Sequence, residues 1–205
     1  MIAPRLASTA VLVRERQGDE QQVQLETLLL LRNHQLAFAA GAWVFPGGKI
    51  ETEDYPGTDR STSDWQQEYR AAVNAVVRET REETGLIIPA EELIHIAHWT
   101  TPPGYTRRYA TWFFLCPVRV PAPVEVDRRE IIDHQWVTPH QALAMHAAGS
   151  LLLTRPTVHT LTTLAEFSTL ATLCPAMRSG DVHVFPEDSE HYPPMRQRAS
   201  HQRSR

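Results

Sequence analysis

The sequence of 205 residues lacks the features that mark several broad classes of protein. It has two cysteines, Cys116 and Cys174, which form no CxxC pair, so a disulfide framework or structural zinc site is not expected. Both are expected to be buried free thiols in a reducing compartment. No apolar run approaches the roughly 20 residues of a membrane-spanning helix, and no signal-peptide h-region opens the chain. We therefore expect a cytoplasmic protein that does not contact membranes.

The sequence also lacks the basic excess of proteins that coat nucleic acid. Its formal net charge is −4, which argues against a nucleic acid polymer as partner but leaves a small nucleotide substrate possible. The ten histidines show no HExxH or similar ligand spacing. A hydrophobic content of 42% and the length fit one globular domain with a substantial core. Whether the protein forms a homodimer stays open.

Hydrophobic patterns predict strands and helices in mixed order along the chain. In the strand over 8–13, Thr9, Val11 and Val13 face one side while Ala10 and Leu12 face the other. Further strands are predicted over 23–31, 42–45, 94–100, 109–118 and 131–137. Helices are predicted over 69–84, from the Thr138 cap to Gly149, and from Pro156 onward. These elements predict an α/β sandwich around a mixed sheet.

The domain is expected to span residues 1–179, with two segments outside its regular elements. Residues 51–67 are polar, and the segment 51–70 is predicted to be an insert that runs largely as a surface loop. From residue 180 onward the chain is rich in Pro, Arg, His and Ser and shows no periodicity. We expect 180–205 to be a flexible tail.

Three glutamates lie close together near the end of the helix predicted over 69–84. Glu79 precedes Glu82 by three residues and Glu83 by four, so all three project from one side of the helix. Like charges at these spacings destabilise a helix by about 0.2–0.5 kcal/mol per pair, and acids near its C-terminus oppose its dipole. A hard divalent cation offsets both effects, because Mg²⁺ and Mn²⁺ prefer carboxylate oxygens. The alternative is a solvated charged face in which Arg78 pairs with Glu82.

The surroundings of these glutamates favour the metal site. Together with Gly47-Gly48 upstream, the stretch resembles the Nudix box, G-x5-E-x7-R-E-U-x-E-E-x-G-U, where U is apolar. The second half of that pattern is matched by Arg78, Glu79, Glu82, Glu83, Gly85 and Leu86. The resemblance implies a Nudix-type α/β/α sandwich around a mixed sheet. It also implies a hydrolase that cleaves a diphosphate bond in a nucleotide-linked substrate with Mg²⁺ or Mn²⁺.

The first half of the box departs from the pattern. Between Gly48 and Arg78 lie 29 residues where the pattern has 13, so 16 are extra. The position eight before Arg78 is Arg70 rather than glutamate, and Thr80 replaces the usual apolar residue. The middle glutamate therefore has no assigned equivalent; the candidates are Glu51, Glu53, Asp54 and Glu68.

The resemblance assigns roles residue by residue. It implies that Glu79 and Glu83 are metal ligands and that Glu82 is a ligand or the base that takes a proton from the attacking water. Arg78 is expected to orient the carboxylates of the helix. Gly47 and Gly48 are expected to bring the loop backbone close to the helix and to the substrate.

Other polar residues are candidates for the substrate site. One of Arg107 and Arg108 is placed to reach a phosphate, but adjacent residues in a strand point apart, so both are not expected to do so. Trp99, Tyr105 and Tyr109 are candidates for stacking on a base. Glu130 lies six residues before Trp136, in a loop where many family members place an acid, and is a candidate ligand or base. Each has the alternative role of an ordinary surface or packing residue.

The substrate expectation depends on one branch of the family. Arg32-Asn33-His34, the run from Gly41 to Gly48, the long insert and Trp136-Val137-Thr138-Pro139 resemble a branch that hydrolyses coenzyme A and its esters. Coenzyme A or an acyl ester is therefore expected, with Arg32 and His34 as candidates to meet its 3′-phosphate. ADP-ribose or a nucleotide sugar is the main alternative.

Two functions of other classes stay open for a Nudix-like domain. A non-catalytic nucleotide-binding module would be favoured by loss of the box glutamates, but all three are present. A prenyl diphosphate isomerase would need an activated cysteine, and Cys116 lies within a predicted strand with no sign of activation.

Overall fold

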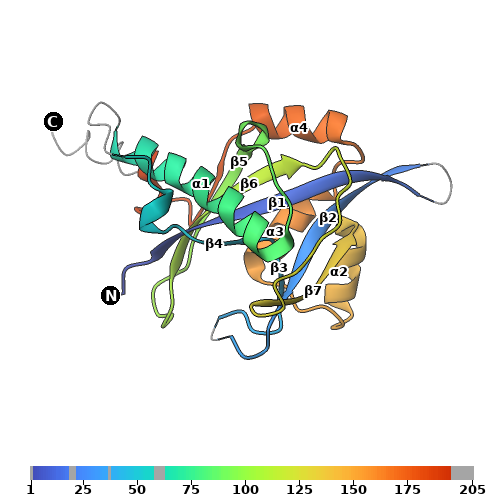
Figure 1. Ribbon diagram of the computed structural model, residues 1–205, viewed down its shortest axis with the longest axis horizontal. Helices are drawn as coiled ribbons and strands as arrows, with labels where there is room; N and C mark the ends of the chain where they lie inside the picture. The colour runs from blue at the N-terminus through green and yellow to red at the C-terminus, as the bar shows by residue number, and fades with distance from the viewer. Residues whose placement is uncertain (1, 19–21, 37, 58–62, 195–205) are drawn as a thin grey trace.

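A computed structural model of the protein describes residues 2–18, 22–36, 38–57 and 63–194 (Figure 1). Within these ranges, eight strands form one mixed sheet: β1 Arg5–Gln17, β2 Val23–Arg32, β3 Trp43–Val44, β4 Gly47–Lys49, β5 Ile94–Thr100, β6 Tyr109–Pro117, β7 Ile131–Val137 and β8 His183–Phe185. The helices are α1 Asp64–Thr84, α2 Pro139–Ala147, α3 Arg155–Leu164 and α4 Leu170–Ser179, with short 3-10 turns η1 Thr52–Asp54 and η2 Ala90–Glu92. The predicted α/β class is confirmed.

The sheet runs in the order β3-β2-β1-β6-β5-β8, with β4 also paired to β1 and β7 to β2. Its central pair, β1 and β6, is parallel, whereas β1 with β2 and β5 with β6 are antiparallel. β4 lies beside the first half of β1, where Gly47 pairs with Thr9 and Gly48 with Ser8. This pairing fixes the glycines relative to the centre of the sheet.

Both faces of the sheet are covered by apolar side chains, as the alternation in the first strand predicts. Val11 and Val13 pack in the core beneath α2, α3 and α4, while Ala10 and Leu12 pack in the core that includes α1. β2 contributes to both cores in the same way. Burying one such leucine stabilises the fold by about 1.5–3 kcal/mol, so the central strands hold the two layers together.

Helix α1 begins earlier than predicted, at Asp64 rather than near 69. The side chain of Gln66 accepts a hydrogen bond from the backbone N–H of Ser63 at 3.2 Å, which forms part of a capping box that the sequence prediction overlooked. The helix ends at Gly85 as expected, because this residue adopts the left-handed conformation with φ of 72°. The segment 51–70 is therefore a 3-10 turn and two helical turns as well as loop; residues 58–62 lie outside the described residues.

The C-terminal part of the chain is more ordered than predicted. Helix α4 was missed because Pro175 lies inside it, and the tail prediction is wrong for His183–Phe185, which form β8 against β5. The ring of Phe185 stacks on that of Trp99 at 4.0 Å, and Ser189 Oγ lies 2.8 Å from Thr100 Oγ1. These contacts explain why the segment packs; residues 195–205 lie outside the described part.

Two further predictions concern caps and cysteines. Thr138 caps α2, since its Oγ1 accepts a hydrogen bond from Gln141 N at 3.2 Å. Cys116 and Cys174 are buried free thiols, as expected. Among the described residues, none of the helices is both long and apolar enough to cross a membrane.

Candidate active site

The C-terminal half of α1 presents two of its glutamates to strand β4. The buried Glu83 accepts a hydrogen bond from the backbone N–H of Gly47 at 2.8 Å. A Cβ atom at Gly48 would collide with the carboxylate of Glu79, so a larger residue there would displace that side chain from its present position. The structure therefore brings Gly47, Gly48, Glu79 and Glu83 together.

Arg78 and Asp54 form the ion pair that supports this arrangement. Asp54 is only 4% exposed and accepts hydrogen bonds from Nε and Nη2 of Arg78 at 3.0 and 2.8 Å. Asp54 follows Gly48 with five residues between them, which is the spacing of the middle glutamate in the Nudix box. Counting forward from Gly48 instead of back from Arg78 would have selected it. The 16 extra residues then all follow Asp54.

Arg78 also holds two box glutamates. Its Nη1 donates to Glu79 Oε1 at 2.9 Å and to Glu82 Oε2 at 3.1 Å, while Nη2 also donates to the carbonyl of Lys49 at 3.1 Å. The Glu82 side chain is 58% exposed and turns toward Arg78 rather than toward Glu83. Three carboxylates were predicted to project together from this helix. In the structure Glu79 and Glu83 lie against β4, whereas Glu82 is bonded to Arg78.

Burial and mutual repulsion disturb the two converging carboxylates. The pKa of Glu83 is raised to about 8, because burial and, to a smaller extent, the charge of Glu79 raise it more than the hydrogen bond from Gly47 N–H lowers it. The pKa of Glu79 is also raised, by burial first, although Arg78 opposes the change. Hard oxygen donors that repel each other fit a divalent cation. Among the described residues, however, no three His, Cys, Asp or Glu side chains gather closely enough to form a complete site.

Arg32, the last residue of β2, and Glu130, directly before β7, interact electrostatically with Glu83. Arg32 Nη2 lies 3.9 Å from Glu130 Oε2, and the Glu130 side chain is 62% exposed. Asn33 N donates to the carbonyl of Glu130 at 2.8 Å, which ties the two loops together. The charges of Arg32 and Glu130 lower and raise the pKa of Glu83 respectively, so both lie near it.

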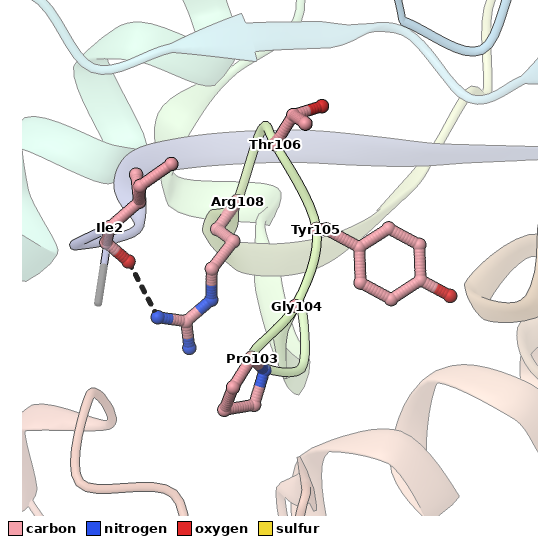
Figure 2. Close-up of a pocket in the computed structure, with 6 residues that line it drawn as sticks. All are labelled: Ile2, Pro103, Gly104, Tyr105, Thr106 and Arg108. Atoms are coloured by element: carbon pink, nitrogen blue, oxygen red, sulfur yellow. Dashed lines mark hydrogen bonds between the residues drawn. The ribbon is translucent and has the colours of Figure 1, made fainter.

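The remaining predicted substrate residues lie around the β5–β6 loop. Arg108 is 7% exposed and donates to the backbone carbonyls of Ile2 at 2.7 Å and Thr101 at 2.9 Å. Figure 2 shows its guanidinium reaching across to the backbone of Ile2. Arg107 is exposed, and the ring of Tyr109 packs against that of Phe38 at 4.9 Å. The structure does not bring these residues into contact with the carboxylates of α1.

Comparison with known proteins bears on this site. A family model described as the NUDIX domain matches residues 4–155. A Nudix hydrolase from Alicyclobacillus acidocaldarius is similar in structure, with a TM-score of 0.71 and 22% identity over 88% of this chain and 100% of that one. A MutT protein from Methanosarcina mazei has a TM-score of 0.54 and 20% identity over 81% of this chain and 96% of that one.

A third similar structure is the NUDIX domain of Shewanella oneidensis NrtR complexed with ADP ribose. Its TM-score is 0.52, with 17% identity over 81% of this chain and 89% of that one. The chain matches no curated protein. At these identities the structural comparisons show a shared fold. The family model, which spans most of the chain and both halves of the box, shows that the protein belongs to the Nudix family of diphosphate hydrolases.

Proposed function

We propose that the protein hydrolyses coenzyme A or a short acyl ester at its diphosphate, using Mg²⁺ or Mn²⁺. The observation that carries the catalytic part is the convergence of Glu79 and Glu83 on the glycine strand, supported by the Arg78–Asp54 pair. The preference for coenzyme A is supported by the resemblance of several segments to one branch of the family.

Glu79 and Glu83 are proposed to hold the metal. When bound, a divalent ion would neutralise the phosphate oxygens and lower the pKa of the attacking water. Water adds to one phosphorus atom as the bond from that phosphorus to the bridging oxygen breaks. Coenzyme A would then give adenosine 3′,5′-bisphosphate and phosphopantetheine.

The proton of the attacking water is assigned to Glu82 or Glu130. Both side chains are largely exposed, and the charges of both raise the pKa of Glu79, so both lie near the proposed metal ligands. Arg78 is proposed to position Glu79 and Glu82 rather than to touch substrate, because all its terminal nitrogens already donate to this protein. Arg32 is proposed to neutralise charge beside Glu83.

ADP-ribose is a second candidate substrate, supported by the similar NrtR domain that was solved with it. The same carboxylates would cleave its diphosphate. Comparing kcat/KM for coenzyme A, acetyl-coenzyme A and ADP-ribose separates the two. A tenfold preference for ADP-ribose, equal to about 1.4 kcal/mol of transition-state binding, would overturn the coenzyme A assignment and leave the hydrolase intact.

A further inference from the structure

Three arginines gather where the first strand meets the β5–β6 loop. Arg5, Arg107 and Arg108 line a small pocket together with Ile2, Thr106 and Tyr109. The main chain fixes this arrangement, since Arg5 N donates to the carbonyl of Arg108 at 2.9 Å and Arg5 is paired with Tyr109 across β1 and β6. The pocket is therefore built on the end of the central sheet.

The buried member of this group, Arg108, has no acidic partner. Its Nε and Nη1 donate to the main-chain carbonyls of Thr101 and Ile2, and within the described ranges no carboxylate lies within 4 Å of its guanidinium. In Figure 2 the other terminal nitrogen points away from Ile2 toward the space beside Pro103 and makes no bond to the residues drawn. A buried charge without a counter-ion is unfavourable, so an anion bound beside Arg108 would stabilise its guanidinium.

The chain segments around the pocket add to the positive field. No aspartate or glutamate occurs in residues 1–14 or 93–124, although the whole protein carries a net charge of −4. Arg5 and Arg107 are both exposed, and neither has a salt-bridge partner among the described residues. Three arginines thus line one small pocket, and none of them forms a salt bridge with an acid among the described residues.

The pocket lies within reach of the diphosphate site. Arg5 precedes Ser8, the partner of Gly48, by three residues, which corresponds to about 10 Å along a strand. Tyr109 lines the pocket and packs against Phe38 in the loop that starts after Arg32. Figure 1 shows the β2–β3 and β5–β6 loops projecting from the same side of the molecule. One substrate of nucleotide size is therefore able to contact both places.

We propose that Arg5, Arg107 and Arg108 form a subsite for a phosphate monoester on the nucleotide half of the substrate, remote from the bond that is cut. This inference rests on the proposed hydrolase function. Arg107 and Arg108 both precede β6, so the alternation that would point adjacent strand residues apart does not apply to them. A phosphate monoester carries a charge of about −1.5 to −2 near neutral pH and three acceptor oxygens, which suit the forked donors of arginine. Arg32 interacts with Glu83 and Glu130, so we assign it to the diphosphate of the substrate rather than to this phosphate monoester.

Coenzyme A and its 3′-dephospho form provide a matched pair of substrates. We expect the wild-type kcat/KM to be at least tenfold higher for coenzyme A. In the double variant Arg5→Gln/Arg107→Gln, that value should fall about tenfold for coenzyme A and stay unchanged for the dephospho form. The exposed Arg119→Gln variant is the control and should retain the wild-type ratio. Equal rates for the two substrates in wild type, or equal losses for both in the double variant, would overturn the subsite.

A binding measurement separates this proposal from the substrate assignment. By calorimetry, adenosine 3′,5′-bisphosphate should bind the wild type at least tenfold more tightly than AMP, and the double variant should lose the difference. That result supports the subsite even if coenzyme A is not hydrolysed, in which case only the proposed substrate fails. Equal affinities for the two nucleotides would overturn the subsite whatever the turnover. Arg108→Gln is avoided as the main test because Arg108 also joins main-chain segments.

Discussion

Replacing Asp54 with asparagine tests whether the pair with Arg78 stabilises the fold and positions the site. Asparagine keeps nearly the shape of aspartate but removes the charge from a position that is 4% exposed. Removing one partner of a buried ion pair costs about 3–5 kcal/mol. Because the Arg78 side chain is 31% exposed and keeps Glu79 and Glu82 as partners, we expect a smaller loss of about 2–3 kcal/mol in the free energy of unfolding.

Denaturant and thermal unfolding at neutral pH measure this loss. It corresponds to a decrease of about 4–12 °C in Tm for a domain of this size. The neighbouring exposed Glu53→Gln variant is the matched control and should change stability by less than about 0.5 kcal/mol. Metal-dependent kcat should also fall in Asp54→Asn, because Arg78 then loses one of the two bonds, and the opposite charge, that fix its guanidinium beside Glu79.

The pH dependence of the unfolding free energy is a second test of the Asp54–Arg78 pair. Burial raises the pKa of Asp54, but the hydrogen bonds from Arg78 and from Glu51 N outweigh it and hold the pKa below its usual range. The pair therefore stabilises the fold above the ordinary carboxyl pKa and loses this effect as the pH falls through the lowered value. The difference between wild type and Asp54→Asn should shrink on acidification. Equal stability of Asp54→Asn and Glu53→Gln at neutral pH would refute the reasoning.

Three other changes probe separate parts of the structure. Gly48→Ala should lower kcat by tenfold or more, because its methyl group displaces the Glu79 carboxylate. Circular dichroism should show that the variant is folded, and an unchanged kcat in steady-state kinetics would contradict the prediction. Burial lowers the pKa of His95 from 6.5 to about 4, so about 3 kcal/mol of stability present above pH 6.5 should be lost as the pH falls to 4. The His95→Phe variant should show a correspondingly smaller loss in denaturant titrations at the two pH values. Glu130→Gln should lower kcat if this residue takes the proton from water, whereas wild-type kcat would leave Glu130 a surface charge.

The regular core could be predicted from the sequence because its signals are local. Alternation in the first strand assigned Val11 and Leu12 to opposite faces, and Gly85 marked the end of α1. Strand β8 could not be predicted in this way, since its three residues are held by stacking on Trp99 and by pairing with β5. Such contacts join segments far apart in the chain and produce no periodic hydrophobic pattern in the sequence.

In the candidate site, too, the features set by local sequence could be predicted, and those set by contacts with other side chains could not. The box placed Glu79 and Glu83 correctly on one helix, because helical spacing determines which side chains share a face. It did not predict that Glu82 would turn to Arg78, since a side-chain rotamer depends on the surrounding charges. The sequence also did not predict that Arg108 would be buried without an acidic partner. Its guanidinium is held by the main-chain carbonyls of Ile2 and Thr101, and Ile2 is distant from Arg108 in the chain.

The most direct test of the central claim is metal-dependent turnover of coenzyme A by wild type and by Glu83→Gln. This substitution retains an oxygen that accepts the Gly47 N–H but removes the charge proposed to hold the cation. With Mg²⁺ or Mn²⁺, the wild type should release adenosine 3′,5′-bisphosphate, and excess EDTA should abolish the reaction. The variant should lose about a hundredfold or more in kcat, the size of a lost catalytic electrostatic interaction. Full activity of Glu83→Gln, or of the wild type in EDTA, would contradict the account.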